Sequence, residues 1–517
     1  MRSTLIPMLV LAACGTASDK DSWSAADSDV GDYDGDGTSR YEDTATPDGT
    51  DTAADDEGEP RDDTGVPGET VPTNPWVDTT QDALSTFSVD VDSASYSLAR
   101  REIGRGVLPA PSTVRTEEFV NYFRYEDAGP QGDEPFTVHL ELAPAPFGPA
   151  PDVELLRIHL QSKTVPPDQR KPANLVFLID VSGSMNAPDK LGLVKWSLSQ
   201  LIDKLGPADT LGIVVYAGAE RVVLEPTEAA HKSTILDAID ALQAGGSTNG
   251  EAGIRRAYQL AKQAFVTGGI NRVVLATDGD FNVGLTGESL IREVESWRDQ
   301  GIFLTTLGFG MRNTQEAFLE QLADRGDGNH AFVDSRNEAL RVLGDRLVST
   351  LQVVAKDVKI QVAFDPAAVE RWRLIGYENR VLAHEDFADD TKDAGEIGAG
   401  HGVTAFYEVD LAPGAAGPLA EVHLRHKPPE GGASTEQTWS LDVEDGHGTL
   451  AQASPSFRFG AAVAEWAEIL RRSPHSEGAP FAEVHALASE AWPPAARGPE
   501  KTEFLGLVNA SSTLWRP

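Results

Sequence analysis

The stretch that decides the fold is residues 175–184, which read LVFLIDVSGS. Its first five residues are apolar without interruption, which is typical of a parallel β-strand that is covered on both faces. The acidic residue Asp180 and the hydroxyl residues Ser182 and Ser184 follow this strand directly. In an open parallel sheet, ligands collect outside the carboxyl ends of the strands. The stretch therefore predicts a buried strand that delivers three oxygen ligands to the edge of a sheet.

Strands and helices alternate on the C-terminal side of this stretch. Apolar strand patterns occur at 211–216, 273–276 and 302–307. Helical patterns lie between and after them, at 191–205, 233–242, 251–265, 289–300, 314–323 and 337–350. Such alternation predicts an α/β unit over residues 173–350, with a mostly parallel, Rossmann-like sheet and helices on both of its faces.

Two further loops of this unit carry oxygen ligands. Residues 245–248 read GGST before a helix and include the hydroxyl group of Thr248. Residues 277–279 read TDG at the end of a buried strand and include the carboxylate of Asp278. These donors are all hard oxygens, which favour Mg²⁺, Mn²⁺ or Ca²⁺ over zinc. The alternative is an ordinary α/β domain in which Ser, Thr and Asp cap the starts of helices.

The order and spacing of these elements resemble the von Willebrand factor type A (VWA) domain, including the inserted domains of integrins. The matching residues are those of its metal-ion-dependent adhesion site: Asp180, Ser182, Ser184, Thr248 and Asp278. The resemblance implies that both serines bind the metal directly. It implies that the two aspartates bind directly or through water, and that Thr248 does so in one conformation. It also implies an open coordination position for an acidic side chain of a partner.

Segments outside this unit resemble a family of bacterial VWA lipoproteins. They are residues 87–92, 114–123, 374–380 and 393–401. Strand patterns before residue 173 and after residue 356 predict that the VWA unit is inserted in a β-rich flanking domain. The expected regions are an N-terminal VWA-associated region at 76–135, the two parts of the β-rich flank at 136–172 and 351–450, and a helical C-terminal region at 451–517. In the first of these, Asp92 or Ser93 is expected to cap a helix that runs to Arg101.

The first 14 residues have the pattern of a lipoprotein signal peptide. Arg2 precedes a short apolar run, and residues 11–14 read LAAC, which resembles the bacterial lipobox. Cys14 is the only cysteine of the chain and is the expected lipidation site. The alternative is an ordinary signal peptide with an incidental cysteine. This pattern predicts a protein of the bacterial cell envelope, anchored to a membrane by lipid on its periplasmic or surface face.

Residues 15–75 have the composition of a disordered tether. They contain 18 acidic and only 3 basic residues, and few apolar ones, so they cannot bury enough surface to fold. Within them Asp32, Asp34, Asp36 and Asp43 fit the spacing of a calcium loop. The match is weak, because Asp43 stands where a glutamate is expected and no helical pattern flanks the loop. A solvated acidic stalk is the alternative interpretation.

The net charge and the motifs of the sequence reduce the number of function classes that the chain could belong to. A net charge of −38 argues against a nucleic-acid partner, which needs Lys and Arg. The chain has no nucleophile-elbow, zinc-protease or P-loop motif, so we expect a binding protein and not an enzyme. The prediction is an adhesion or scaffold protein that binds a protein or other macromolecule through a divalent cation. The alternatives are a calcium-responsive structural envelope protein and a hydrolase.

Overall fold

The computed structural model of the chain describes residues 72–516, except residues 151, 167, 247–249, 280–286, 311–315, 347–350, 393 and 477. Cys14, nearly all of the acidic segment with its residues 32–43, and Thr248 lie outside the described residues. No helix in the described part of the chain is both long and apolar enough to cross a membrane.

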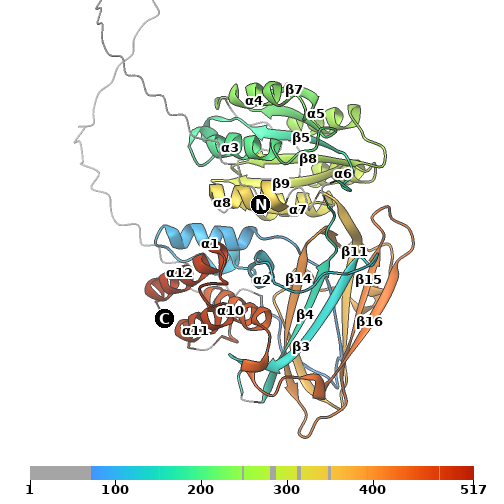
Figure 1. Cartoon of the computed structure of the whole chain (residues 1–517), viewed down its shortest axis with the longest axis vertical. Coiled ribbons are helices and arrows are strands. Elements are labelled where there is room, and N and C mark those ends of the chain that lie inside the picture. Colours follow the sequence, from blue (N-terminus) through green and yellow to red (C-terminus); the bar gives the residue numbers. More distant parts are fainter. Residues whose placement is uncertain are drawn as a thin grey trace, which may run out of the picture. The chain divides into compact units, whose positions relative to one another are not determined.

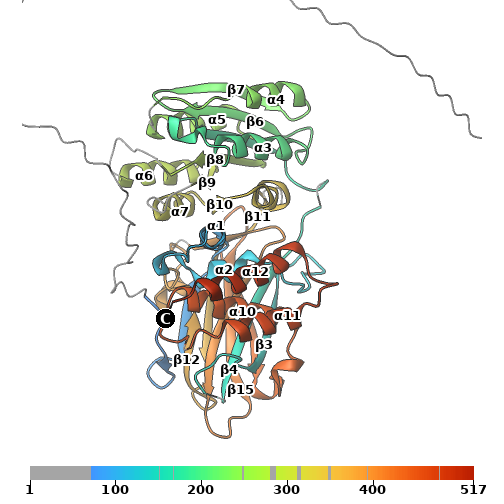
Figure 2. The same ribbon diagram turned by 90° about the vertical axis from the view of Figure 1, so that its left-hand side faces the viewer.

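The VWA-like unit is built on a six-stranded sheet. In spatial order its strands are β10 (His330–Val333), β9 (Phe303–Phe309), β8 (Ile270–Thr277), β5 (Ala173–Asp180), β6 (Thr210–Tyr216) and β7 (Glu220–Glu228). All neighbours are parallel except β6 and β7. Figure 2 shows β7 and β10 at opposite ends of this sheet. The α/β fold expected from the sequence is therefore confirmed, and the two end strands are additions to it.

Helices cover both faces of this sheet. Their bounds are α3 (Leu191–Ile202), α4 (Lys232–Asp240), α5 (Gly250–Gln263), α6 (Gly287–Arg298), α7 (Glu316–Arg325) and α8 (Arg336–Ala339). Successive side chains of a strand point to opposite faces. Phe177 and Ile179 of β5 therefore pack in the core with α3, α4 and α8, whereas Val176 and Leu178 pack with α5, α6 and α7. Burial on both faces explains why this strand is apolar throughout.

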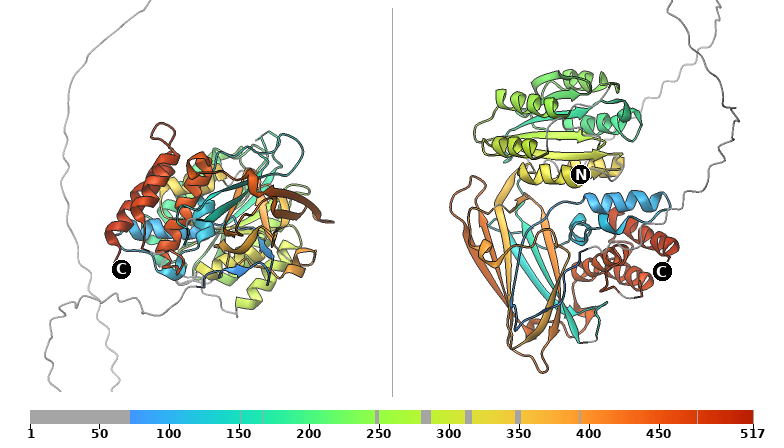
Figure 3. Two further views of the ribbon diagram at one scale, coloured as in Figure 1. Left: turned by 90° about the horizontal axis from the view of Figure 1, so that it is seen from below. Right: turned by 180° about the vertical axis from the view of Figure 1, so that it is seen from behind.

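The β-rich flank consists of two sheets. One has the order β1 (Val77–Asp78), β12 (Val369–Ile375), β14 (Gly402–Leu411), β4 (Val153–Ser162) and β3 (Phe136–Pro144). The other contains β13 (Gly395–Gly398), β11 (Val353–Phe364), β15 (Pro418–Lys427) and β16 (Thr435–Asp442), with β2 (Leu84–Ser88) also paired to β11. Figure 3 shows the strands of the flank as layered sheets, and their facing side chains form one core.

Strand pairing confirms that the VWA-like unit is inserted in this flank. β4, which precedes the unit, pairs along its length with β14, which follows it. The two chain connections also meet, because the backbone N–H of Lys171, before β5, donates to Oε1 of Gln352, before β11, at 3.2 Å.

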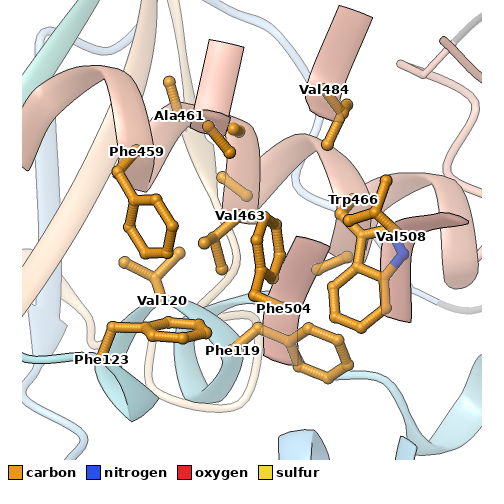
Figure 4. Close-up of a cluster of buried hydrophobic side chains, with 14 of the residues drawn as sticks. Phe119, Val120, Phe123, Phe459, Ala461, Val463, Trp466, Val484, Phe504 and Val508 are labelled. Carbon is orange, nitrogen blue, oxygen red and sulfur yellow. The ribbon is translucent and has the colours of Figure 1, made fainter. Parts of the chain in front are cut away.

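Five helices form a third region. They are α1 (Ala94–Gly104), α2 (Thr116–Tyr122), α10 (Pro455–Leu470), α11 (Phe481–Ala491) and α12 (Pro499–Leu514). Figure 1 shows α1 and α2 beside α10 and α12, although more than 300 residues separate them in the chain. Figure 4 shows the aromatic core that these helices share, in which Trp466 of α10 lies 5.3 Å from the rings of both Phe119 and Phe504.

The expected side-chain cap of α1 is wrong. Ser93 does occupy the cap position, but its side chain makes no capping hydrogen bond. Its Oγ instead accepts a hydrogen bond from Nη2 of Arg341 at 2.8 Å, and Oδ1 of Asp92 accepts one from the backbone N–H of His330 at 2.9 Å. Both side chains therefore bind to the inserted unit, because tertiary hydrogen bonds have replaced the local one.

Buried ion pairs join the inserted unit to the other regions. Glu338 of α8 binds Arg341, which follows it, and Arg100 of α1, and it also accepts a hydrogen bond from the hydroxyl group of Tyr122 of α2. We call these four residues the Glu338 cluster. On the flank side, Arg380 pairs with Asp324 of α7 at 3.0 Å. The inserted unit is thus held by charged contacts as well as by its chain connections.

Candidate metal centre

The carboxyl ends of three neighbouring strands meet at one edge of the inserted sheet. β5 ends at Asp180, whose partner in the parallel ladder on β6 is Tyr216. On the other side, Ile179 pairs with Ala276 of β8, so Thr277 and Asp278 emerge next to Asp180. The two aspartates that are separated by 98 positions in the sequence therefore lie at the same edge because of strand register alone.

Asp180 is fully buried and is oriented by three hydrogen bonds. Its Oδ1 accepts the backbone N–H of Ser182 at 2.8 Å. Its Oδ2 accepts the hydroxyl groups of Thr277 at 3.2 Å and Tyr216 at 3.3 Å. Burial raises the pKa of Asp180, the Ser182 hydrogen bonds lower it, and the nearby Asp278 carboxylate raises it further. Two carboxylates that repel each other at a buried edge are a suitable setting for a cation, which would favour their ionised forms.

The two serines follow Asp180 at a short 3₁₀ turn, Gly183–Asn186, which Ser182 directly precedes and which contains Ser184. The Oγ atoms of Ser182 and Ser184 are 3.0 Å apart. Ser182 is buried whereas Ser184 is exposed. Their hydroxyl groups therefore lead from the buried carboxylate of Asp180 toward solvent, and a ligand bound to Ser184 is accessible from outside.

The loop that leads to Thr248 is held against the serine turn. The backbone N–H of Gly183 donates to the carbonyl of Gly246 at 3.1 Å, and that of Gly245 donates to the carbonyl of Val181 at 2.7 Å. Gly246 has a φ of +96°, and a Cβ atom there would lie 3.3 Å from that of Ala217. A glycine is required at this position for both reasons. Thr248 itself remains a prediction, since it lies outside the described residues.

A lysine that sequence analysis did not consider lies at the same site. Nζ of Lys190 donates to Oδ2 of Asp278 at 2.8 Å, and the side chain of Asp278 is almost fully buried. Lys190 precedes the first turn of α3, and no spacing rule connects it with a residue 88 positions away. Tyr216 and Thr277 were also missed, although both stand at strand ends that the register places beside Asp180.

The donor set at this edge consists of two carboxylates and two hydroxyl groups among the described residues. The described ranges, this edge included, hold no group of three or more His, Cys, Asp or Glu side chains placed to bind a metal, so a cation here would depend on hydroxyl groups as well as carboxylates. Hard oxygens of this kind suit Mg²⁺, Mn²⁺ or Ca²⁺, which can complete their coordination with water or with a group from another molecule. The residues present therefore fit a divalent cation with an open coordination position.

A shallow hollow opens beside the serine turn. Its volume is about 460 Å³, and Met185, Leu191 and Leu242 are among the residues that line it. Because the hollow adjoins the turn that carries Ser184 and is also lined by Asn186, Lys195 and Gln243, a group bound at the serine hydroxyls would have a mixed polar and apolar surface next to it.

Comparisons with known proteins agree with this architecture. Residues 174–346 match the family model of the von Willebrand factor type A domain, residues 69–157 match one described as von Willebrand factor, and residues 349–514 match the C-terminal region of uncharacterized protein YfbK. The chain is 38% identical over 462 residues to YfbK of Escherichia coli, covering 84% of this chain and 79% of that protein.

More distant relatives match the chain in part. It is 31% identical over 207 residues to human inter-alpha-trypsin inhibitor heavy chain H4, which corresponds to 38% of this chain and 21% of that protein. Among solved structures, it is similar to a von Willebrand factor type A protein from Catenulispora acidiphila. That match has 15% identity and a TM-score of 0.43, and it covers 76% of this chain and 99% of that one.

Proposed function

Because the chain belongs to the family of bacterial von Willebrand factor type A proteins that includes YfbK of Escherichia coli, we propose that it is an adhesion or scaffold protein of the bacterial envelope that binds its partner through a divalent cation. Proteins with this domain generally mediate protein interactions. The more specific proposal is carried by one observation: Asp180, Ser182, Ser184 and Asp278 gather at one sheet edge, with their donors leading from the interior to solvent.

Each residue has a distinct part in this proposal. Ser182 and Ser184 would hold the cation directly, and the oriented carboxylate of Asp180 would hold it directly or through water, as would Asp278. When bound, the cation offers a coordination position to an acidic side chain of the partner. The chain itself repels such a group, since its net charge is −38, so a local positive centre is needed for the partner to approach. The hollow beside the serine turn would take a neighbouring side chain of the same partner.

The first test is the loss of the cation. In wild type we expect Mg²⁺ or Mn²⁺ to raise the melting temperature, because a ligand that binds only the folded state stabilises it. Asp180→Asn should abolish this shift while keeping the size of the buried side chain. The pair Ser182→Ala with Ser184→Ala should abolish it too. Titration calorimetry measures the affinity directly, and Asp237→Ala, an exposed aspartate on α4, is the matched control. Equal Mn²⁺ affinity in wild type and Asp180→Asn would refute the site.

A partner should depend on the same cation. Envelope extract passed over the immobilised wild-type protein should yield a bound protein with Mg²⁺ and not with EDTA, and Asp180→Asn should not retain it. Binding of that protein in EDTA would remove the cation from the recognition mechanism.

The proposed place in the envelope depends on Cys14. A lipid chain contributes about 0.8 kcal/mol for each buried CH₂ group, so its loss should detach the protein. Cys14→Ser is therefore expected to move the chain from the membrane fraction to the soluble fraction, as measured by fractionation and immunoblotting. Ser18→Ala, four residues further on, should leave it in the membrane fraction. A Cys14→Ser variant that stays with the membrane would contradict lipid anchoring.

A further inference from the structure

Lys190 contacts the candidate metal centre without being a metal ligand. We propose that Lys190 is a specificity-determining residue: its ammonium group stays on Asp278, leaves the cation-loaded site with one net positive charge, and so makes the site select anionic partner groups at the expense of metal affinity. This inference rests on the proposed function, because it concerns the same site. It assigns a role to Lys190 and explains, from its charge, a preference for anionic partner groups that the oxygen donors alone do not explain.

The position of the ammonium group is fixed by three elements. The backbone of Lys190 lies directly before α3, where its N–H donates to the carbonyl of Ala187 at 3.1 Å and its carbonyl accepts from Val194 at 2.9 Å. The tip of the side chain reaches Asp278, which follows β8. Its aliphatic stem passes over Gly310, at the end of β9. A Cβ atom on Gly310 would lie 2.7 Å from Cγ of Lys190 and 2.8 Å from Cε.

This path indicates that the ion pair between Lys190 and Asp278 is held in place by the surrounding backbone. Gly310 has a φ of +58°, a conformation that glycine adopts readily, and its missing side chain makes room for the lysine stem. A lysine held along such a path has few alternative rotamers. Forming the ion pair therefore costs less side-chain entropy than it does for a lysine on the surface. The side chain of Lys190 is 21% exposed and that of Asp278 is 1% exposed. The pair is therefore screened by water less than a surface pair.

The charges lead to opposite effects on the metal and on the partner. Without a cation, Lys190 compensates the buried carboxylate of Asp278, which would be costly to leave unpaired. With a divalent cation, ammonium and metal repel each other across one carboxylate, so the metal binds less tightly. Among these groups, the two carboxylates of Asp180 and Asp278 cancel the charge of the metal. The ammonium group of Lys190 then supplies the one remaining positive charge. An anionic group that approaches the open coordination position is attracted by both cations.

The experiment compares Lys190→Met with wild type in the full chain. Titration calorimetry with MnCl₂ is expected to give about tenfold tighter binding in Lys190→Met, since the repulsion is gone. With the site saturated by Mn²⁺, acetate serves as the probe anion and is followed by its paramagnetic line broadening. Its affinity should fall at least fivefold in Lys190→Met. In EDTA the same variant should melt about 2–4 °C below wild type, because Asp278 has lost the ammonium group of Lys190, and Mn²⁺ should remove this difference in melting temperature.

Two further variants serve as controls. Lys190→Arg keeps the charge and should resemble wild type in Mn²⁺ affinity. Lys232→Met removes an ion pair with Asp203 at the opposite end of α3, and both affinities should remain those of wild type. An Mn²⁺ affinity in Lys190→Met that is equal to or weaker than wild type, or an unchanged acetate affinity, would overturn the role of Lys190.

Failure of this inference can be separated from failure of the proposed function. If Mn²⁺ binds wild type in a manner that Asp180→Asn abolishes, and Lys190→Met changes nothing, only the role of Lys190 is lost. If neither wild type nor Lys190→Met binds Mn²⁺, both are overturned. Mn²⁺ binding in Lys190→Met alone would overturn both, since the ammonium group would then exclude the metal from the wild-type site.

Discussion

Replacing Glu338 by alanine is expected to lower the free energy of unfolding by about 3–5 kcal/mol, the usual cost of removing one partner of a buried ion pair. The side chain of Glu338 is fully buried. It accepts hydrogen bonds from Nη2 of Arg100 at 2.9 Å, Nε of Arg341 at 2.8 Å and the hydroxyl group of Tyr122 at 2.8 Å. Its removal leaves two guanidinium groups in the interior with one anion fewer, and urea unfolding at pH 7 measures the loss.

A neighbouring glutamate provides the matched control. Glu503 pairs with the same Arg100, but its side chain is 38% exposed. Because exposed ion pairs contribute little, Glu503→Ala should cost at most about 1 kcal/mol. Similar losses in the two variants would mean that the Glu338 cluster contributes no more than a surface pair.

The Glu338 cluster should also make stability depend on pH. Burial opposes ionisation, but Arg341 and Arg100 outweigh it and hold the pKa of Glu338 at about 2, against an ordinary 4.5. Since the folded-state pKa is the lower one, the stabilisation is fully present above about pH 4.5 and is lost as the pH falls toward 2. Glu338→Gln cannot titrate, so the difference in unfolding free energy between it and wild type should shrink from pH 5 to pH 3.

Trp466→Ala is expected to destabilise the helical region by about 3–5 kcal/mol, which is the range for removing a large aromatic side chain from a core. Trp466 is fully buried, and its ring packs against Tyr96, Phe119 and Phe504. These partners come from α1, α2 and α12, so one substitution opens a cavity where the two N-terminal helices meet the C-terminal ones. Calorimetric melting of the full chain measures the effect.

Trp466→Phe and Trp515→Ala are the controls for this prediction. The phenylalanine variant fills most of the cavity and should lose less stability. Trp515 lies at the margin of the same core and is half-buried, so its truncation should also cost less. If Trp515→Ala were as damaging as Trp466→Ala, the aromatic cluster would not be the centre of this region.

The α/β fold could be predicted because its central strands are apolar on both faces. That pattern marks β5, β6 and β8 in the sequence. The two end strands were missed for physical reasons: the apolar run of β7 is only three residues long, with a single buried residue in the strand, and β10 has only four residues. The association of α1 and α2 with the C-terminal helices could not be predicted, because no local pattern encodes contacts across more than 300 residues.

The part of the candidate site that could be predicted is the set of residues that directly follow buried strands. Asp180, Ser182, Ser184 and Asp278 each follow a recognisable buried strand, and parallel register brings them together. Lys190 was not predictable in this way. Its contact depends on where α3 begins and on the space above Gly310, which are tertiary properties. Thr248, the calcium-loop spacing of residues 32–43 and the lipidation of Cys14 remain predictions from sequence.

The contact between Lys171 and Gln352 restricts how the inserted unit can rotate. A domain attached through a single linker can rotate about any axis. Two neighbouring attachments leave mainly a hinge rotation about the line through the two attachment points. The ion pairs of Arg100 and Arg380 with the unit oppose this rotation. Asp180 lies at the far end of β5, which spans roughly 23 Å from Ala173 at about 3.3 Å per residue. A molecule bound there as proposed would therefore be presented in one orientation to the flank, and a pulling force on it would act on these ion pairs through the length of the strand.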